Sequence, residues 1–206
     1  MAIHFPIPAT FIHIPRTGGK SFEYWVKANI TDYNIQGANC KLEQAKEIWP
    51  NLGLVFTFVR NPFDRLVSMY HYVGQEAERR IALRKTQTVD TSIEDDVRAL
   101  RLYQKGFKDW ITADVGEFEN KELAFWYSVR QDTQVSWINT SADLIIKTEN
   151  INQEFYKVQE LLNCSVPLLH VNTSSHNHYR EYYNSQTQRL VETIFAEDLA
   201  AFEYKF

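Results

Sequence analysis

A run of six residues, Leu54-Val-Phe-Thr-Phe-Val59, constrains the fold of this chain more than any other feature. It carries no charge and shows no alternation of polar and apolar residues, which is typical of a parallel β-strand covered on both faces. Asn61-Pro62 follows at once and favours a helix start, because proline fits the first turn of a helix. The run therefore predicts a buried strand of an α/β sheet, followed by a helix.

The same order of strand, loop and helix recurs at two shorter apolar runs. Thr10-Phe-Ile-His-Ile14 precedes the turn Pro15–Gly19 and a helix that opens at Ser21. Asp143-Leu-Ile-Ile-Lys147 precedes a helix over Asn152–Leu162. Start and stop signals predict the other helices, which are Lys41–Trp49, Pro62 to about Glu76 or beyond, Ser92–Gln104, Phe107–Ile111, Glu122–Arg130 and the helical stretch Ser185–Phe202.

This alternation indicates an α/β protein. We expect one domain over residues 1–206, with a P-loop-like, three-layer fold in which helices flank a small central parallel sheet. The polar stretch Lys85–Thr91 is predicted to be a loop. Ligands of such sheets bind beyond the carboxyl ends of the strands, so the loops at that edge are where a site is expected.

Composition restricts the classes of function. Hydrophobic residues make up 44% of the chain and aromatic residues 14%, which is enough to bury a core. The 22 Lys and Arg against 26 Asp and Glu argue against a protein that grips nucleic acid through a basic excess. Cys40 and Cys164 are too few for a disulfide scaffold and fit a reduced, cytoplasmic setting. Neither a signal peptide nor an apolar run of about 18 residues occurs in the sequence, so we expect no membrane partner.

Acidic residues are unevenly distributed along the chain. Most of the 26 lie between Glu76 and Glu160, whereas three segments, residues 1–22, 54–63 and 163–180, contain none. These acid-free segments hold Arg16, Lys20, Arg180 and five of the six histidines. Burial of strands accounts for the second segment, but the cations and histidines of the first and third indicate an anion site assembled from separated segments.

The loop after the first predicted strand carries the clearest signal of such a site. Arg16-Thr-Gly-Gly-Lys-Ser21 combines a glycine turn, two cations and a helix N-terminus, where backbone N–H groups and the helix dipole favour phosphate-like oxyanions. Gly19-Lys20-Ser21 matches the end of an ATP-type P-loop, but Ile14 occupies the place of its first glycine. A tight structural connection is the alternative reading of the two glycines.

Arg60 ends the second predicted strand, where a nucleoside triphosphatase would place an aspartate that helps to hold Mg²⁺. A cation at this position indicates that protein charges, and no metal, neutralise the bound anion. This disfavours a kinase.

Two motifs together resemble a known family. His13-Ile-Pro-Arg-Thr-Gly-Gly-Lys-Ser21 is similar to the "HIPKTGGTS" 5′-phosphosulfate loop, and Phe58-Val-Arg-Asn-Pro-Phe-Asp-Arg-Leu-Val-Ser-Met-Tyr70 is similar to the "FVRNPYDRLVSAY" 3′-phosphate element. Both belong to carbohydrate-type sulfotransferases that use 3′-phosphoadenosine 5′-phosphosulfate (PAPS). Weaker similarities to this family follow in the same order, at Ile145–Ile151, His170–Ser174, Tyr179–Tyr183 and Asp198–Tyr204.

The resemblance implies a role for each matching residue. Arg60 and Ser68 would hold the 3′-phosphate, and Asn172 and Ser174 would close over the nucleotide, although ordinary turn chemistry is the alternative for this last pair. PAPS would be the co-substrate and 3′-phosphoadenosine 5′-phosphate (PAP) the product. The 5′-phosphosulfate would be cradled by Arg16, Thr17, Gly18, Gly19, Lys20 and Ser21.

Catalytic residues follow from the same resemblance, with departures. The family usually has Lys where this chain has Arg16 and Thr where it has Lys20, so both cations are assigned to the leaving group. Related carbohydrate enzymes often have a histidine between the two motifs, where this chain has Gly37-Ala-Asn39. We assign the general base to His71, three residues after Ser68 on about the same helix face. Glu43, His176 and His178 are the alternatives.

The sequence therefore predicts a metal-independent, PAPS-dependent sulfotransferase that acts on an acceptor hydroxyl of a small molecule or carbohydrate. One alternative is a small-molecule or nucleoside kinase that uses Gly19-Lys20-Ser21 and Mg²⁺. The other is a non-catalytic nucleotide-binding module, which the missing histidine keeps open.

Overall fold

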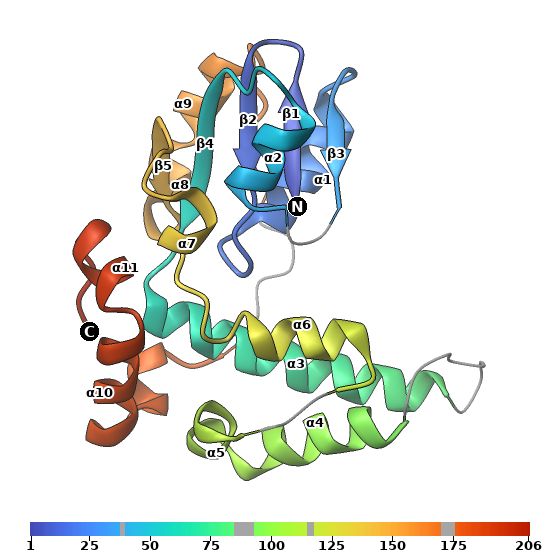
Figure 1. The fold of residues 1–206 in the computed structure, drawn as a ribbon, viewed down its shortest axis with the longest axis vertical. Helices are drawn as coiled ribbons and strands as arrows, with labels where there is room; N and C mark the ends of the chain where they lie inside the picture. Colours follow the sequence, from blue (N-terminus) through green and yellow to red (C-terminus); the bar gives the residue numbers. More distant parts are fainter. Residues whose placement is uncertain (38–39, 85–92, 115–117, 170–175) are drawn as a thin grey trace. The chain divides into compact units, whose positions relative to one another are not determined.

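The computed structural model describes residues 1–37, 40–84, 93–114, 118–169 and 176–206 (Figure 1). The chain divides into two compact units. The sheet unit comprises Met1–Asn61, Thr133–Thr173 and Glu197–Tyr204, and the helical unit comprises Pro62–Asp132, Ser174–Ala196 and Lys205–Phe206. One domain over residues 1–206 stays a prediction. The expected loop at Lys85–Thr91 lies outside the described residues.

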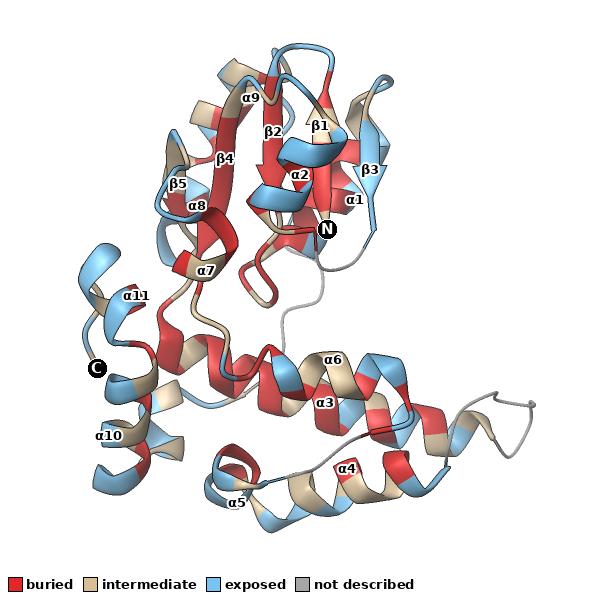
Figure 2. Ribbon diagram, viewed as in Figure 1, coloured by how far each residue is buried: buried red, intermediate tan, exposed pale blue. Residues whose placement is uncertain are grey.

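The sheet unit contains a five-stranded sheet in the order β3-β1-β2-β4-β5 (Figure 1). The three predicted strands are present and parallel, as β2 (Ala9–Ile12), β4 (Leu54–Val59) and β5 (Leu144–Lys147). The α/β fold class is therefore confirmed. Figure 2 shows β2 and β4 buried along their length, as the uncharged run predicts.

Two antiparallel strands that the sequence analysis did not predict extend the parallel sheet at one edge. β1 (Ala2–Phe5) pairs antiparallel with β2, and β3 (Asn34–Gln36) pairs antiparallel with β1. A short turn after Phe5 joins the first two strands as a hairpin, and its prolines hid the strand signal. β3 has three exposed residues and therefore no apolar pattern to detect.

Helices cover both faces of this sheet. α1 (Gly19–Asn29), α8 (Ile151–Glu154) and α9 (Tyr156–Leu161) share one hydrophobic core with the strands. The rings of Phe11 and Phe22 lie at the centre of that core, 4.6 Å apart in an edge-on arrangement. α2 (Leu42–Ile48) lies on the opposite face and contacts α7 (Val135–Ile138) (Figure 1). Thr148–Asn150 forms a short 3₁₀ turn after β5, and α11 (Ala196–Ala201) also lies mainly in this unit.

The helical unit is built around α3 (Pro62–Leu83), which extends beyond Glu76. α4 (Ile93–Lys105) packs along it, and a Cβ at Gly74 would come 2.2 Å from the Tyr103 ring, so glycine permits this approach. The buried Asp96 carboxylate receives the Arg84 guanidinium at 2.8 Å between the same two helices. The unit also contains α5 (Phe107–Thr112), α6 (Lys121–Ser128), the 3₁₀ turn Tyr179–Tyr182 and α10 (Ser185–Ile194). None of the helices within the described ranges combines the length and apolar character that a membrane span requires.

Candidate functional site

The loop between β2 and α1 holds a fixed shape. Arg16 and Gly18 adopt left-handed backbone conformations, with φ of 68° and 89°. Thr17 is fully buried, and its hydroxyl donates to the Ile14 carbonyl at 2.8 Å. The Thr148 hydroxyl donates to the Thr17 carbonyl at 2.9 Å, which ties the loop to the chain after β5. The turn is therefore held by a hydrogen bond of its own and by one from the 3₁₀ turn after β5.

The start of α1 has the features of an oxyanion site. Gly18 is the N-cap and carries no side chain, and the first turn has no acidic residue. The first N–H groups of a helix have no acceptor within the helix, and the helix dipole adds positive potential there. A Cβ at Gly19 would come 1.9 Å from the His13 ring, so only glycine lets the helix begin against this imidazole. These residues fit a phosphate or sulfate group.

His13 supports this helix start without adding charge. Burial first, and then the charges of the N-terminal amino group, Lys20 and Arg16, lower the pKa to about 3 against the opposing effect of Glu23. The imidazole is therefore neutral near pH 7. Its role beside Gly19 is to fill space, and the positive charge of the loop comes from Arg16 and Lys20.

Lys20 lies on the exposed side of α1. Its Nζ is 2.7 Å from Oε2 of Glu23, whose other oxygen receives Lys27 at the same distance. Burial raises the pKa of Glu23, but the hydrogen bonds from Lys20 and Lys27 outweigh burial and hold the pKa below its usual value. Lys20 would have to leave this carboxylate to reach a leaving group, so its catalytic role stays a prediction.

Arg60 and the first loop come together in the sheet unit. Ile12 of β2 lies beside Thr57 of β4 in the parallel register, so both strands end at the same edge of the sheet. Nη1 of Arg60 donates to the Arg16 carbonyl at 3.4 Å. The Thr148 hydroxyl donates to both the Thr17 and Val59 carbonyls, each at 2.9 Å. Two of the acid-free segments thus meet at the expected edge, and Thr148 joins them.

The predicted residues of the helical unit lie on α3. Ser68 is fully buried, and its pairing with Arg60 stays a prediction because the two residues belong to different units. His71 contacts two tyrosines, with Nε2 2.8 Å from the Tyr182 hydroxyl and Nδ1 3.3 Å from the Tyr103 hydroxyl. Its ring stacks on His176, with centroids 5.4 Å apart. Burial and the nearby His176 lower the pKa of His71, which favours the neutral ring.

The alternative bases have other surroundings. Glu43 is exposed on α2, and its hydrogen bond from Lys46 holds the pKa of the carboxyl below its usual value, which makes it a weaker base. His178 caps the turn Tyr179–Tyr182 by accepting from the Arg180 N–H at 3.4 Å. Asn172 and Ser174, which carry two of the cofactor predictions, lie outside the described residues. The third acid-free segment includes them and contributes described residues to both units.

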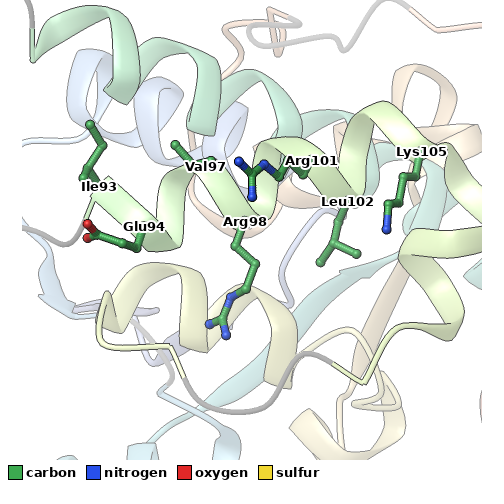
Figure 3. A pocket seen from close by; sticks show the side chains of 7 residues that line it. All are labelled: Ile93, Glu94, Val97, Arg98, Arg101, Leu102 and Lys105. Atoms are coloured by element: carbon green, nitrogen blue, oxygen red, sulfur yellow. The ribbon is translucent and has the colours of Figure 1, made fainter.

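A hollow on the surface of α4 contains none of the predicted site residues (Figure 3). Its lining consists of Ile93, Glu94, Val97, Arg98, Arg101, Leu102 and Lys105. Arg98 lies 3.2 Å from Asp95 and has its guanidinium 3.9 Å from the centre of the Phe118 ring. Across the part of the chain that the structure describes, no three His, Cys, Asp or Glu side chains gather as a metal site would need.

Comparisons with known proteins match the chain to one family. A family model described as "Sulfotransferase family" matches residues 11–205. No curated protein matches the chain. Among solved structures, the chain is similar to a sulfotransferase from Alicyclobacillus acidocaldarius, at 15% sequence identity and a TM-score of 0.34. That match covers 78% of this chain, which spans 57% of the length of the matched protein.

Proposed function

The chain belongs to the sulfotransferase family, and from this premise we propose that it transfers the sulfuryl group of PAPS to an acceptor hydroxyl. The observation that carries the proposal is the meeting of two cationic segments, where the Arg60 guanidinium donates to the Arg16 carbonyl beside the start of α1. PAPS has anionic groups at its 5′ and 3′ positions and therefore needs two anion-binding elements. Neighbouring parallel strands that end in Arg60 and in the Arg16 loop supply them.

We assign the 5′-phosphosulfate to the N–H groups at the start of α1 and to Arg16. The 3′-phosphate is assigned to Arg60, whose planar guanidinium suits bidentate contact with phosphate oxygens, and to the Ser68 hydroxyl. The expected closure of Asn172 and Ser174 over the nucleotide completes the proposed donor site.

In the transfer, an acceptor oxygen forms a bond to sulfur while the bond between sulfur and the 5′-phosphate oxygen breaks. The electron pair of the broken bond stays on that phosphate, and Arg16, with Lys20 once it leaves Glu23, stabilises the growing charge. The acceptor proton passes to His71, whose lowered pKa keeps the ring able to accept it near pH 7. The acceptor hydroxyl must displace one of the tyrosine hydroxyls that now contact His71.

We assign the acceptor to a carbohydrate or another small molecule with a free hydroxyl. The support is the similarity of the two motifs to carbohydrate-type enzymes. A panel of mono-, oligo- and polysaccharides beside phenols and simple alcohols tests this assignment, with transfer of labelled sulfate from PAPS as the readout.

Titration calorimetry tests the donor. We expect PAP to bind without metal and ATP not to bind, with or without Mg²⁺. Arg60→Ala removes two charge-assisted hydrogen bonds and should weaken PAP binding about 100-fold. Arg189→Ala, an exposed arginine on α10, is the matched control and should leave PAP affinity unchanged.

Three results would contradict the proposal in different ways. Mg²⁺-dependent ATP binding would favour the kinase. PAP binding without transfer to any acceptor would favour a non-catalytic module. Equal weakening of PAP binding by Arg60→Ala and Arg189→Ala would remove Arg60 from the donor site.

A further inference from the structure

Arg60 directly follows the last residue of β4, and side chains from elsewhere in the chain hydrogen-bond to its backbone. The Arg60 N–H donates to Oε1 of Gln134 at 2.9 Å, and Nε2 of Gln134 donates to the Arg60 carbonyl at 2.8 Å. The next N–H, that of Asn61, donates to Oε1 of Glu149 at 2.7 Å. Three successive backbone groups thus have partners from distant parts of the chain. These bonds set the direction in which the chain leaves the sheet.

Asp198 fixes the orientation of the Gln134 amide. Gln134 and Asp198 are both fully buried, and Oδ2 of Asp198 accepts from the Gln134 N–H at 2.8 Å and from Gln134 Nε2 at 3.2 Å. Oδ1 of the same carboxylate accepts from the Val135 N–H at 2.9 Å. A flipped amide would turn its oxygen toward two acceptors, the Asp198 carboxylate and the Arg60 carbonyl. Only one orientation satisfies every partner, and that orientation serves the Arg60 backbone.

Glu149 has a second partner on the same C-terminal segment. The Tyr204 hydroxyl donates to its Oε2 at 2.9 Å, and the Tyr204 ring also lies against the Lys147 ammonium, 4.7 Å from the ring centre. Burial and the adjacent Glu149 carboxylate raise the pKa of Tyr204, so its hydroxyl stays protonated and remains a donor. Asp198 and Tyr204 each support one of the two side chains that hold the backbone at Arg60 and Asn61.

We propose that Gln134 and Asp198 are positioning residues, which orient Arg60 for the donor 3′-phosphate through the paired Gln134 amide. A bidentate phosphate contact tolerates little error in the placement of the guanidinium, and a strand end held by two hydrogen bonds reduces that error. The C-terminal segment thereby sets the geometry of a site formed near the start of the chain. The proposal rests on the proposed function for the identity of the ligand, but its contacts stand on the structure alone.

Two near-isosteric variants test the proposal. Gln134→Glu replaces the Nε2 donor by an acceptor, and Asp198→Asn weakens the carboxylate that orients the amide. We expect PAP affinity to fall about tenfold in each, in line with the loss of one or two buried hydrogen bonds. Asp95→Asn is the matched control, because the buried Asp95 of the helical unit also accepts a backbone N–H, that of Asn120 at 2.7 Å. It should leave PAP affinity unchanged.

A double-mutant cycle separates positioning from general structural damage. If Gln134 acts through Arg60, then Gln134→Glu should cause no further loss of PAP affinity in the Arg60→Ala background. PAP affinity within twofold of the wild type in both single variants would overturn the proposal. So would additive losses in the double variant, or an equal loss in Asp95→Asn.

A second measurement is independent of the ligand and of variant folding. Amide hydrogen exchange in the wild-type protein should show the Arg60 N–H protected at least as well as those of β4, because its acceptor on Gln134 is fully buried. Fast exchange at Arg60 would overturn the positioning role. Absence of PAP binding by the wild-type protein would instead contradict the proposed function. Hydrogen exchange at Arg60 would then test by itself whether Gln134 holds the Arg60 backbone.

Discussion

The two units use buried charge in different ways. In the sheet unit, the buried Asp198 carboxylate accepts hydrogen bonds from neutral N–H groups of Gln134 and Val135. In the helical unit, the buried Asp96 receives Arg84 at 2.8 Å and lies near Arg80, so opposite charges join α3 to α4. The first arrangement orients a strand end, and the second holds two helices together. We therefore expect Asp198 to affect mainly the geometry of the candidate site, and Asp96 to affect mainly the stability of the fold.

The largest loss of stability is expected from Asp96→Ala. Removal of a fully buried carboxylate takes away the partner that Arg84 contacts at 2.8 Å, which should lower the free energy of unfolding by about 3–5 kcal/mol. Chemical denaturation measures this loss, and calorimetry on the folded fraction measures PAP affinity. We expect that affinity to be unchanged. A fall in PAP affinity along with the loss of stability would contradict the purely stabilising role of Asp96.

A pair of glycine substitutions compares the units directly. Gly19→Ala would drive a Cβ against the His13 ring, and Gly74→Ala would drive one against the Tyr103 ring. Each should lower the free energy of unfolding by about 1–3 kcal/mol through overpacking. Gly37→Ala, at a position with nothing within 4 Å of the added Cβ, is the control. Only Gly19→Ala should also weaken PAP binding, so equal weakening by Gly74→Ala would contradict the assignment of the 5′-phosphosulfate to the start of α1.

Local sequence predicted those parts of the fold whose signal is local. The run at Leu54–Val59 is buried for its entire length except at its first residue, and the observed strand has the predicted bounds. β1 was missed because prolines follow it closely, and β3 because it is exposed and only three residues long. The stretch Ser185–Phe202 forms two helices that part at Phe195. No periodic pattern marks such a break.

The candidate site likewise has residues that lie in local motifs, which the sequence predicted, and distant partners, which it did not. The Arg16 loop and Arg60 were predicted because each lies in a continuous motif at the end of a strand, and parallel strands bring such ends to one edge. The partners of Arg60 were not predicted. Gln134 lies 74 positions from Arg60, and Asp198 lies 64 positions from Gln134, so only the fold brings them together. A buried amide and a buried carboxylate have no sequence pattern of their own.

Acidification should lower the free energy of unfolding through the buried His13 of the sheet unit. Its pKa of about 3 in the folded protein lies below the ordinary value of 6.5, so the unfolded chain binds the proton first. The stability that neutral His13 contributes is fully present above its pKa in the unfolded chain, 6.5, and is lost as the pH falls from there toward its pKa in the folded protein. The free energy of unfolding should therefore drop by about 2 kcal/mol between about pH 7.5 and 5.

Two histidine variants sharpen this comparison. His13→Asn should flatten the pH dependence measured by chemical denaturation. His71→Asn should flatten it less, because the pKa of His71 in the helical unit is shifted in the same direction from a less buried position. An unchanged slope in His13→Asn would show that this ring takes up its proton in the folded state.

The smallest change in stability is expected from Lys20→Ala. Lys20 is exposed and Glu23 keeps Lys27 as a second partner, so loss of the pair should cost under about 1 kcal/mol and the fold should hardly change. Turnover should nevertheless fall far more than PAP affinity, because Lys20 is assigned to charge that develops only as the leaving group departs. Lys157→Ala is the matched control, since Lys157 forms a pair with Glu154 at the same spacing. Equal losses of turnover and PAP affinity in Lys20→Ala would reduce Lys20 to a binding residue, and an equal loss of turnover in Lys157→Ala would remove it from the site.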